Sequence, residues 1–432
     1  MKNISVNNGM LEMGGLSAEQ IARAAGTPVY IYDEAQIEAN MQAYVDGFQS
    51  EQFATKVIYA SKAFCSKAMC RLAMQYGLGL DVVSGGELYT ALQAGFPMKD
   101  IVFHGNNKSA AELDMALDNA IGTIVLDNVQ EARQLADISF RYPHVQLKAL
   151  LRVNPGIEAH THKYIQTSKV DSKFGISLQK ADEILQTIQI IQETENITFA
   201  GLHCHIGSQI FEADAFLQAI DTMLGFIKEL KDKGIELSIL DLGGGFGVHY
   251  TDKDKPISIA DMTRTLVEKL EQAISETGVK LKEVWIEPGR SIVAEAGATL
   301  YTVGHTKETP HKKYVFIDGG MADNIRPALY QAEYAADIAN RMNEAKDETV
   351  TIAGKCCESG DIIAEDLPLQ KAENGDLLIT WSTGAYGYSM ASNYNRLGVP
   401  GVVFVKDGSL RQVIRPQTYA DLVASETDEI LL

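Results

Sequence analysis

One lysine of the sequence stands where its amine could bind a carbonyl compound. Lys62 follows the apolar run 57–60 in the segment Tyr-Ala-Ser-Lys-Ala. A lysine amine that is partly withdrawn from water can attack an aldehyde and hold it covalently. Taken alone, Lys62 is explained more simply as a solvated lysine at the end of a strand.

Three consecutive glycines follow another apolar run. They occupy positions 243–245 of the segment Leu-Gly-Gly-Gly-Phe-Gly, after the run 237–242. Backbone N–H groups in such a turn can surround a phosphate. The spacing is not that of a dinucleotide fingerprint, because residue 248 is valine. A plain glycine turn is the alternative.

A carboxylate and a guanidinium lie close together in the segment Glu-Pro-Gly-Arg. Glu287 could bind a cationic ring nitrogen, and Arg290 could bind an anion. An internal salt bridge between them is the simpler explanation. His205 and Ser208, in His-Ile-Gly-Ser-Gln, offer a flat ring and a hydroxyl donor, although a core histidine is more common than a functional one.

Two further groups follow residue 300. Cys357 is a thiol next to Glu358, in Cys-Cys-Glu-Ser-Gly-Asp, where a buried structural cysteine is the usual explanation. Arg326 and Tyr330 are four residues apart around Pro327, which suits the first turn of a helix, so they should share a helix face. A surface pair is the alternative. Together, the amine, the glycine turn that can surround a phosphate, the flat ring, the carboxylate and the thiol are the parts of a pyridoxal phosphate site.

The elements that must position these residues are eight short apolar runs, each ending at a polar or glycine-rich cluster. The runs are 57–60, 80–83, 101–103, 124–126, 147–151, 199–202, 237–242 and 284–286. Amphipathic segments separate them, such as 213–231, and the capping-box spacing Ser84/Glu87 and Ser109/Glu112 marks two helix starts. Chemistry at the carboxyl ends of eight strands predicts an α/β fold with a (β/α)8 barrel at 35–290.

A second pattern follows the barrel. After residue 298, short runs alternate apolar and polar residues, and Asp407-Gly408 is a hairpin signal. The segment 28–32 alternates in the same way. We therefore predict a second, mainly antiparallel β domain formed by 1–34 and 291–432.

Composition limits the kind of protein. The chain has 432 residues, a net charge of −19 and 46% hydrophobic residues. This charge argues against binding nucleic acid or an anionic membrane. Five cysteines without metal-ligand spacing predict reduced thiols and a cytoplasmic location. We expect neither a signal peptide nor a run of about 18 apolar residues that would span a bilayer.

Longer motifs resemble one family from about Gly26 to Val423. They are Tyr-Ala-Ser-Lys-Ala, Asp-Val-Val-Ser-Gly-Gly-Glu, His-Ile-Gly-Ser-Gln, Gly-Gly-Gly-Phe-Gly, Glu-Pro-Gly-Arg, Cys-Glu-Ser-Gly-Asp and Gly-Ala-Tyr-Gly. The chain resembles the diaminopimelate decarboxylases, barrel-type pyridoxal phosphate enzymes related to ornithine decarboxylase and alanine racemase.

The resemblance implies roles for residues of both domains. Lys62 would hold the cofactor, His205 would stack on its ring, Glu287 would pair with the ring nitrogen, and Cys357 would protonate the α-carbon. The implied cofactor-binding residues are Lys62, Asp81, His205, Ser208, Gly243, Gly244, Gly245, Glu287, Pro288, Gly289, Arg290 and Tyr386. The implied substrate-binding residues are Arg290, Arg326, Tyr330, Glu358 and Tyr386. No metal is expected.

The resemblance also implies decarboxylation of meso-2,6-diaminopimelate to L-lysine and CO2. Arginines in the pocket favour a substrate with a carboxylate at its far end. A homodimer is implied, because Cys357 and Glu358 would complete the partner subunit's site. The alternatives are a decarboxylase of ornithine or lysine and a non-catalytic protein that binds the cofactor. The long segment 156–175 is a candidate loop to cover the substrate.

Overall fold

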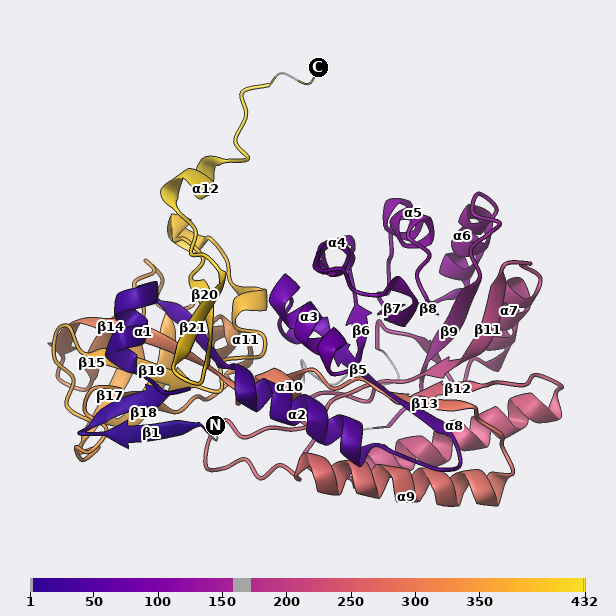
Figure 1. Cartoon of the computed structure of the whole chain (residues 1–432), viewed down its shortest axis with the longest axis horizontal. Coiled ribbons are helices and arrows are strands. Elements are labelled where there is room, and N and C mark those ends of the chain that lie inside the picture. Colours follow the sequence, from indigo (N-terminus) through magenta and orange to yellow (C-terminus); the bar gives the residue numbers. More distant parts are fainter. Residues whose placement is uncertain (1–2, 158–171, 430, 432) are drawn as a thin grey trace. The chain divides into compact units, whose positions relative to one another are not determined.

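The computed structural model describes residues 3–157, 172–429 and 431. The chain forms two compact units, one of residues 39–248 and 255–291, and the other of residues 1–38, 249–254 and 292–432. Figure 1 labels the elements of both. Most of the candidate covering loop, 156–175, lies outside the described residues.

The first unit is a closed barrel of eight parallel strands. Each strand pairs with its neighbours along the chain, and the last pairs with the first to close the ring. The predicted barrel is confirmed, and every predicted run overlaps one of these strands. They are β5 (Ala54–Ala60), β6 (Gly79–Val82), β7 (Ile101–Phe103), β8 (Thr123–Leu126), β9 (Leu147–Asn154), β11 (Ile197–His203), β12 (Ile239–Asp241) and β13 (Glu283–Ile286).

Helices alternate with the strands along the chain, beginning with α2 before β5, and lie outside the ring (Figure 1). Ser109 and Glu112 form the predicted capping box of α5, whereas Ser84 caps α4 and Glu87 instead accepts from the Val83 N–H. The amphipathic segment 213–231 forms α8, with its apolar stripe buried. The helices are α2 (Glu34–Gly47), α3 (Lys67–Gln75), α4 (Gly85–Ala94), α5 (Ala110–Asp118), α6 (Val129–Ser139), α7 (Ala181–Gln192), α8 (Asp214–Asp232) and α9 (Ile259–Thr277). Among the described residues, no helix has the length and apolar character to cross a membrane.

The inside of the barrel is layered. One layer is apolar and consists of Ile58, Val102, Val125, Leu150, Ala200, Ile239 and Trp285. Side chains of a strand alternate between its two faces, so the residue two positions further along points inward as well. On several strands that next inward residue is polar or charged, and these residues form the floor of the candidate site.

The second unit is built on a mixed sheet. Its strands run in the order β18-β17-β15-β14-β4-β20-β21, with β19 and β16 attached to β14. Most pairs are antiparallel, as predicted, but β15–β17 and β4–β20 are parallel. The strands are β4 (Val29–Asp33), β14 (Gly297–Glu308), β15 (Lys313–Ile317), β16 (Ala336–Ile338), β17 (Glu348–Ala353), β18 (Ile362–Leu369), β19 (Leu377–Trp381), β20 (Gly401–Lys406) and β21 (Ser409–Ile414).

Local signals explain part of this sheet. Asp407 and Gly408 both have positive φ, which is the geometry of the predicted hairpin turn between β20 and β21. The predicted N-terminal strand is β4, which pairs with β14 and β20. A small sheet of β1 (Ile4–Asn7), β2 (Met10–Met13) and β3 (Leu16–Ser17) was not predicted.

Candidate active site

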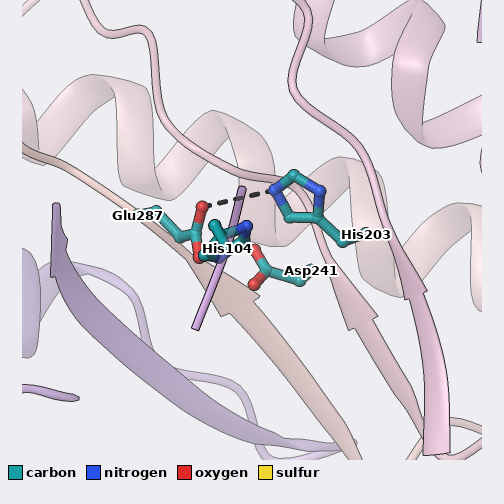
Figure 2. A group of neighbouring side chains, drawn as sticks. All are labelled: His104, His203, Asp241 and Glu287. Carbon is teal, nitrogen blue, oxygen red and sulfur yellow. Dashed lines mark hydrogen bonds and ion pairs between the residues drawn. The ribbon is translucent and has the colours of Figure 1, made fainter. Parts of the chain in front are cut away.

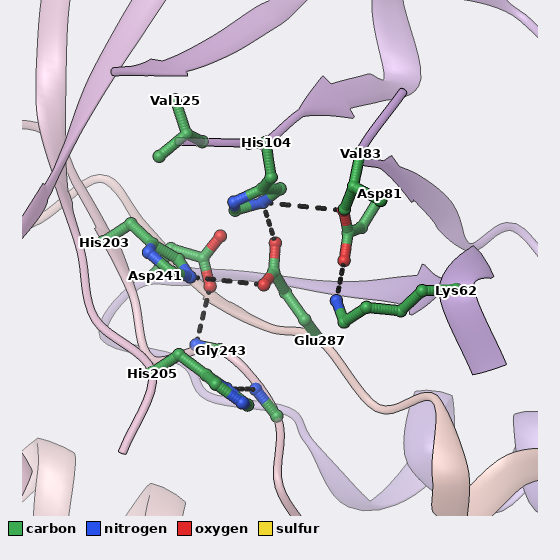
Figure 3. Close-up of polar contacts among 12 residues, drawn as sticks. Lys62, Asp81, Val83, His104, Val125, His203, His205, Asp241, Gly243 and Glu287 are labelled. Atoms are coloured by element: carbon green, nitrogen blue, oxygen red, sulfur yellow. Dashed lines mark hydrogen bonds and ion pairs between the residues drawn. The ribbon is translucent and has the colours of Figure 1, made fainter. Parts of the chain in front are cut away.

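The lysine amine lies against a buried carboxylate. Lys62 is in the short 3-10 helix after β5, and its Nζ is 2.5 Å from Oδ2 of Asp81 on β6 (Figure 3). Asp81 is fully buried, whereas the Lys62 side chain is 39% exposed. A buried carboxylate needs a cation or donors, so Asp81 fixes the amine at the carboxyl end of the barrel while leaving it accessible.

The backbone conformation of the turn at 243–245 requires glycine. Gly243 and Gly245 have φ of 65° and 110°, a region that other residues rarely adopt. A side chain at Gly244 would collide with the carbonyl oxygen of Glu287, and one at Gly245 with that of Gly207. The turn therefore contains glycine because three strand ends approach closely there.

Two donors lie together at the same end of the barrel. Arg290 is buried, and its Nη2 and Nε donate to Oγ of Ser208 at 2.9 and 3.2 Å. A guanidinium and a hydroxyl in contact can both donate to a phosphate. Pro288 and Gly289 connect Glu287 to Arg290, and a side chain at Gly289 would meet Ala60.

The ring of His205 is uncharged at neutral pH. Its Nδ1 accepts from the backbone N–H of Gly244 at 3.2 Å. Burial lowers the pKa of His205 well below its usual value, and the charges of Arg152 and Lys62 lower it further. A neutral, flat ring suits stacking on an aromatic cofactor.

Glu287 is held by two histidines. Its Oε1 accepts from Nε2 of His104 at 2.6 Å, and its Oε2 accepts from Nε2 of His203 at 3.3 Å (Figure 3). Burial acts to raise the pKa of Glu287, but the two histidines outweigh it and hold the pKa well below the usual value. Glu287 is therefore a buried carboxylate at neutral pH.

Sequence reasoning missed His104, His203 and Asp241. Each stands at the carboxyl end of a predicted strand, and they belong to the inward-facing polar layer. The signal that could have identified them is their position two residues after a residue of the apolar layer, which makes them point into the barrel as well. Examples are His104 after Val102 and Asp241 after Ile239.

The four polar side chains of this layer could formally hold a metal ion. One ligand atom from each of His104, His203, Asp241 and Glu287 lies within 4.8 Å of the others (Figure 2). Ligands of one tetrahedral zinc ion stand about 3.3 Å apart, given bonds of about 2.0 Å. The 2.6 Å contact between His104 and Glu287 is shorter than that, so a direct hydrogen bond describes the pair better than shared ligation.

The second unit holds a buried guanidinium among aromatic rings. Arg326 begins α11 (Arg326–Tyr330), is 7% exposed and donates from Nε to the Tyr334 hydroxyl at 2.6 Å. Its guanidinium carbon lies 5.5 to 5.8 Å from the ring centres of Tyr250, Tyr330 and Tyr386. The predicted pairing of Arg326 with Tyr330 on one helix face is confirmed. Within the described residues, no carboxylate forms an ion pair with Arg326.

Tyr386 carries backbone strain beside this guanidinium. Its φ is 60°, in the left-handed region that residues other than glycine seldom occupy. Such strain costs of the order of 1–3 kcal/mol and is concentrated at functional sites.

The two adjacent thiols differ in exposure. Cys356 is buried, and burial together with Asp361 raises its pKa to about 11. Cys357 is exposed, and its N–H donates to Oδ1 of Asn395 at 2.6 Å. Glu358 is also exposed. Only Cys357 of the pair is accessible to a ligand.

The barrel residues fit pyridoxal phosphate. They supply an accessible amine, a donor pair at a glycine turn, a neutral ring and a buried carboxylate. Oδ1 of Asp81 is also buried with no hydrogen-bond partner in the described part of the chain, as expected where a polar ligand belongs.

Comparisons with known proteins agree with this geometry. Residues 34–294 match the family model described as pyridoxal-dependent decarboxylase, pyridoxal binding domain. A diaminopimelate decarboxylase of Bacillus subtilis is 50% identical over 418 residues, which cover 96% of this chain and 95% of that protein. The chain belongs to the diaminopimelate decarboxylase family. Its cofactor is pyridoxal phosphate.

Other members of the family extend the match. A diaminopimelate decarboxylase of Staphylococcus aureus is 47% identical, with 97% of this chain and 98% of that protein covered. The crystal structure of the M. jannaschii enzyme in complex with L-lysine has a TM-score of 0.92 at 35% identity, covering 99% of this chain and 98% of that one. The family likeness therefore includes both units.

Proposed function

We propose that this decarboxylase converts meso-2,6-diaminopimelate to L-lysine and CO2. The observation that carries the proposal is Arg326, a buried guanidinium that no described carboxylate neutralises. A substrate with a carboxylate at each end can neutralise it, whereas lysine or ornithine has only the carboxylate that would be removed. Leaving such a group unpaired costs roughly 2–5 kcal/mol.

The barrel residues hold the cofactor in this proposal. Lys62 binds its aldehyde, Ser208 and Arg290 bind its phosphate with the 243–245 turn, His205 stacks on its ring, and Glu287 binds its ring nitrogen. The bound cofactor supplies an electron sink for the electrons left on the α-carbon when CO2 departs. A carboxylate such as Glu287 favours the protonated ring, which is the stronger sink.

Residues of the second unit bind the substrate. Arg326, with Tyr330 and Tyr386 beside its guanidinium, binds a substrate carboxylate, and Arg290 is a further candidate for this contact. Glu358 binds the distal ammonium group, and Cys357 delivers a proton to the α-carbon. The exposure of Cys357 and the burial of Cys356 support this assignment.

We propose that the protein is a homodimer, with Cys357 and Glu358 completing the partner's site. Mixing the inactive Lys62→Ala and Cys357→Ala proteins should restore part of the activity through subunit exchange. No recovery, with exchange verified by mass spectrometry of the mixed dimer, would indicate a site within one chain. We place the protein in the cytoplasm, where five unpaired thiols remain reduced.

The direct test supplies purified protein and pyridoxal phosphate with meso-diaminopimelate. CO2 and L-lysine should form in equal amounts. Lys62→Ala should form neither, whereas Lys67→Ala, which changes an exposed lysine of α3, should match the wild type. Absence of CO2 from wild type that has bound the cofactor would refute the proposed reaction.

A further inference from the structure

Glu287 lies among three polar side chains from three other barrel strands. His104 follows β7, His203 ends β11 and Asp241 ends β12 (Figure 2). All four residues are buried. An ionised carboxylate in such a place is stable only when donors or cations compensate it, so the groups around Glu287 decide its charge.

We propose that His104, His203 and Asp241 are positioning residues that keep Glu287 ionised for the cofactor's ring nitrogen, and that Asp241 does so as a neutral acid. This inference rests on the proposed cofactor role of Glu287. It adds three residues that lie around Glu287 and act through it.

The proton on Asp241 follows from its contacts. Oδ1 of Asp241 accepts from the backbone N–H of Gly243 at 2.9 Å, which leaves Oδ2 for Glu287. Atoms of the buried Asp241 and Glu287 carboxyl groups lie within 4.8 Å of each other, and two buried carboxyl groups this close are stable only if one of them is protonated.

The environment assigns that proton to Asp241. Burial raises the pKa of Asp241 well above its usual value, and the charge of Glu287 raises it further. The pKa of Glu287 is shifted in the opposite direction by its histidines. Oδ2 of Asp241 is buried and has no hydrogen-bond partner among the described residues, which suits a protonated oxygen better than a carboxylate oxygen.

His203 is a neutral donor. Burial lowers its pKa to about 3, so the ring is uncharged at neutral pH. Its Nε2 faces a carboxylate, which can only accept, and therefore carries the hydrogen. Its Nδ1 is buried with no partner in the described part of the chain, which suits a nitrogen without a proton. Glu287 thus accepts a hydrogen bond from the neutral His203 and lies beside the neutral Asp241, and neither group cancels its charge.

The test compares two cofactors that differ only at the ring nitrogen. Pyridoxal phosphate and 1-deazapyridoxal phosphate share the aldehyde and the phosphate, but the second has C–H in place of nitrogen. Dissociation constants of both are measured on the apoprotein. Asp241→Ala, His104→Leu and His203→Leu each remove a donor and should weaken pyridoxal phosphate about 10-fold or more, but the deaza compound less than about threefold.

Donor-retaining variants provide the matched controls. In Asp241→Asn the amide can accept from Gly243 and donate to Glu287, as the protonated acid does. His104→Gln keeps a donor at the position of Nε2. Both should bind pyridoxal phosphate within about threefold of the wild type.

The proton on Asp241 can be observed without any cofactor. The infrared difference spectrum of wild-type apoprotein minus Asp241→Asn, at neutral pH, should show the carbonyl band of a protonated carboxylic acid, shifted in heavy water. A carboxylate band in its place would refute the neutral acid.

The outcomes separate the two proposals. Equal loss of affinity for both cofactors in the donor-removing variants would reduce the three residues to structural support and overturn the inference. The inference would also be overturned if Asp241→Asn weakened the binding of pyridoxal phosphate as much as Asp241→Ala does. Wild type that binds neither compound would instead refute the proposed cofactor role.

Discussion

The two units stabilise opposite charges in the same way. In the barrel, the carboxylate of Glu287 contacts His104 and His203 and lies within 4.8 Å of the Asp241 carboxyl group. In the second unit, the guanidinium of Arg326 is surrounded by tyrosine rings and one hydroxyl. The neutral partners among these groups, such as His203 and the tyrosines, compensate burial but do not cancel the charge. Each unit therefore retains one charge for a ligand of opposite sign, which we propose are the cofactor's ring nitrogen and a substrate carboxylate.

Other charged side chains of the two units are instead neutralised by a partner of opposite charge. Arg341, in the second unit, contacts Asp376 and Glu373, so its charge is neutralised within the protein. Lys108 of the barrel is similarly paired with Glu131. A buried charge surrounded by uncharged groups is thus a better indicator of a binding site than a buried charge alone.

The largest expected effect separates cofactor binding from turnover. Lys62→Ala should lower kcat by more than about 1,000-fold and abolish retention of the cofactor on gel filtration. Cys357→Ala should lower kcat by about 100-fold or more, through loss of a proton donor, but keep the cofactor. Absorbance of the protein peak and CO2 release measure the two effects.

Cys356→Ala is the control for the thiol, because Cys356 is buried beside it. It should keep kcat within about threefold of the wild type. A larger loss of kcat in Cys356→Ala than in Cys357→Ala would indicate that Cys356, and not Cys357, is the proton donor.

The second prediction concerns Arg326. Arg326→Lys should lower kcat/KM for meso-diaminopimelate by about 30-fold or more, because an ammonium cannot reproduce the guanidinium's fork of donors. Its dissociation constant for pyridoxal phosphate should stay within about threefold of the wild type. Arg341→Lys, at an arginine with acidic partners, should leave both quantities unchanged. Equal effects of the two substitutions would remove the contrast between these arginines.

Stability should depend on pH in opposite directions in the two units. Burial lowers the pKa of His203 to about 3, so its contribution to the free energy of unfolding falls as pH drops below about 6.5. Burial raises the pKa of Asp323 to about 7, so its contribution falls as pH rises from about 4 to about 7. Each slope is about 1.4 kcal/mol per pH unit. Urea denaturation of wild type, His203→Gln and Asp323→Asn measures both.

Each variant removes one titrating group and should therefore lose that group's contribution to the pH dependence of the free energy of unfolding. The difference in unfolding free energy between wild type and Asp323→Asn should become less favourable to wild type as pH rises. The difference between wild type and His203→Gln should move the other way. Parallel trends would contradict the assigned protonation states.

The smallest predicted effect tests the hydroxyl beside Arg326. Tyr334→Phe removes the acceptor of the Nε hydrogen bond but keeps the ring, so kcat/KM should fall about fivefold. Tyr314→Phe, whose ring stacks on Phe316, is the control and should have no effect. An unchanged kcat/KM in Tyr334→Phe would show that the rings alone position the guanidinium.

The barrel and most residues of the candidate site can be predicted from the sequence, because their signals are local. Each strand is a short apolar run with a polar end, and each motif residue lies in a recognisable segment. His104 and His203 were missed because their role depends on which residues of different strands lie at the same level along the barrel axis. Those levels are set by strand register, in which His203 lies opposite Asp241. Register between strands tens of residues apart is not visible in any one segment.

The parallel pairing of β4 with β20 illustrates the same limit. The alternation of 28–32 predicts a strand, but its partner at Gly401–Lys406 is more than 360 residues away. The exposure of Cys357 and the burial of Cys356 also depend on the fold, because the sequence shows two equivalent thiols.

Substrate discrimination tests the central claim most directly. The ratio of kcat/KM for meso-diaminopimelate to that for ornithine and for lysine is measured by CO2 release from the holoprotein. A substrate without the second carboxylate leaves Arg326 unpaired, so the ratio should be at least about 30 for each. A ratio near one would contradict the account.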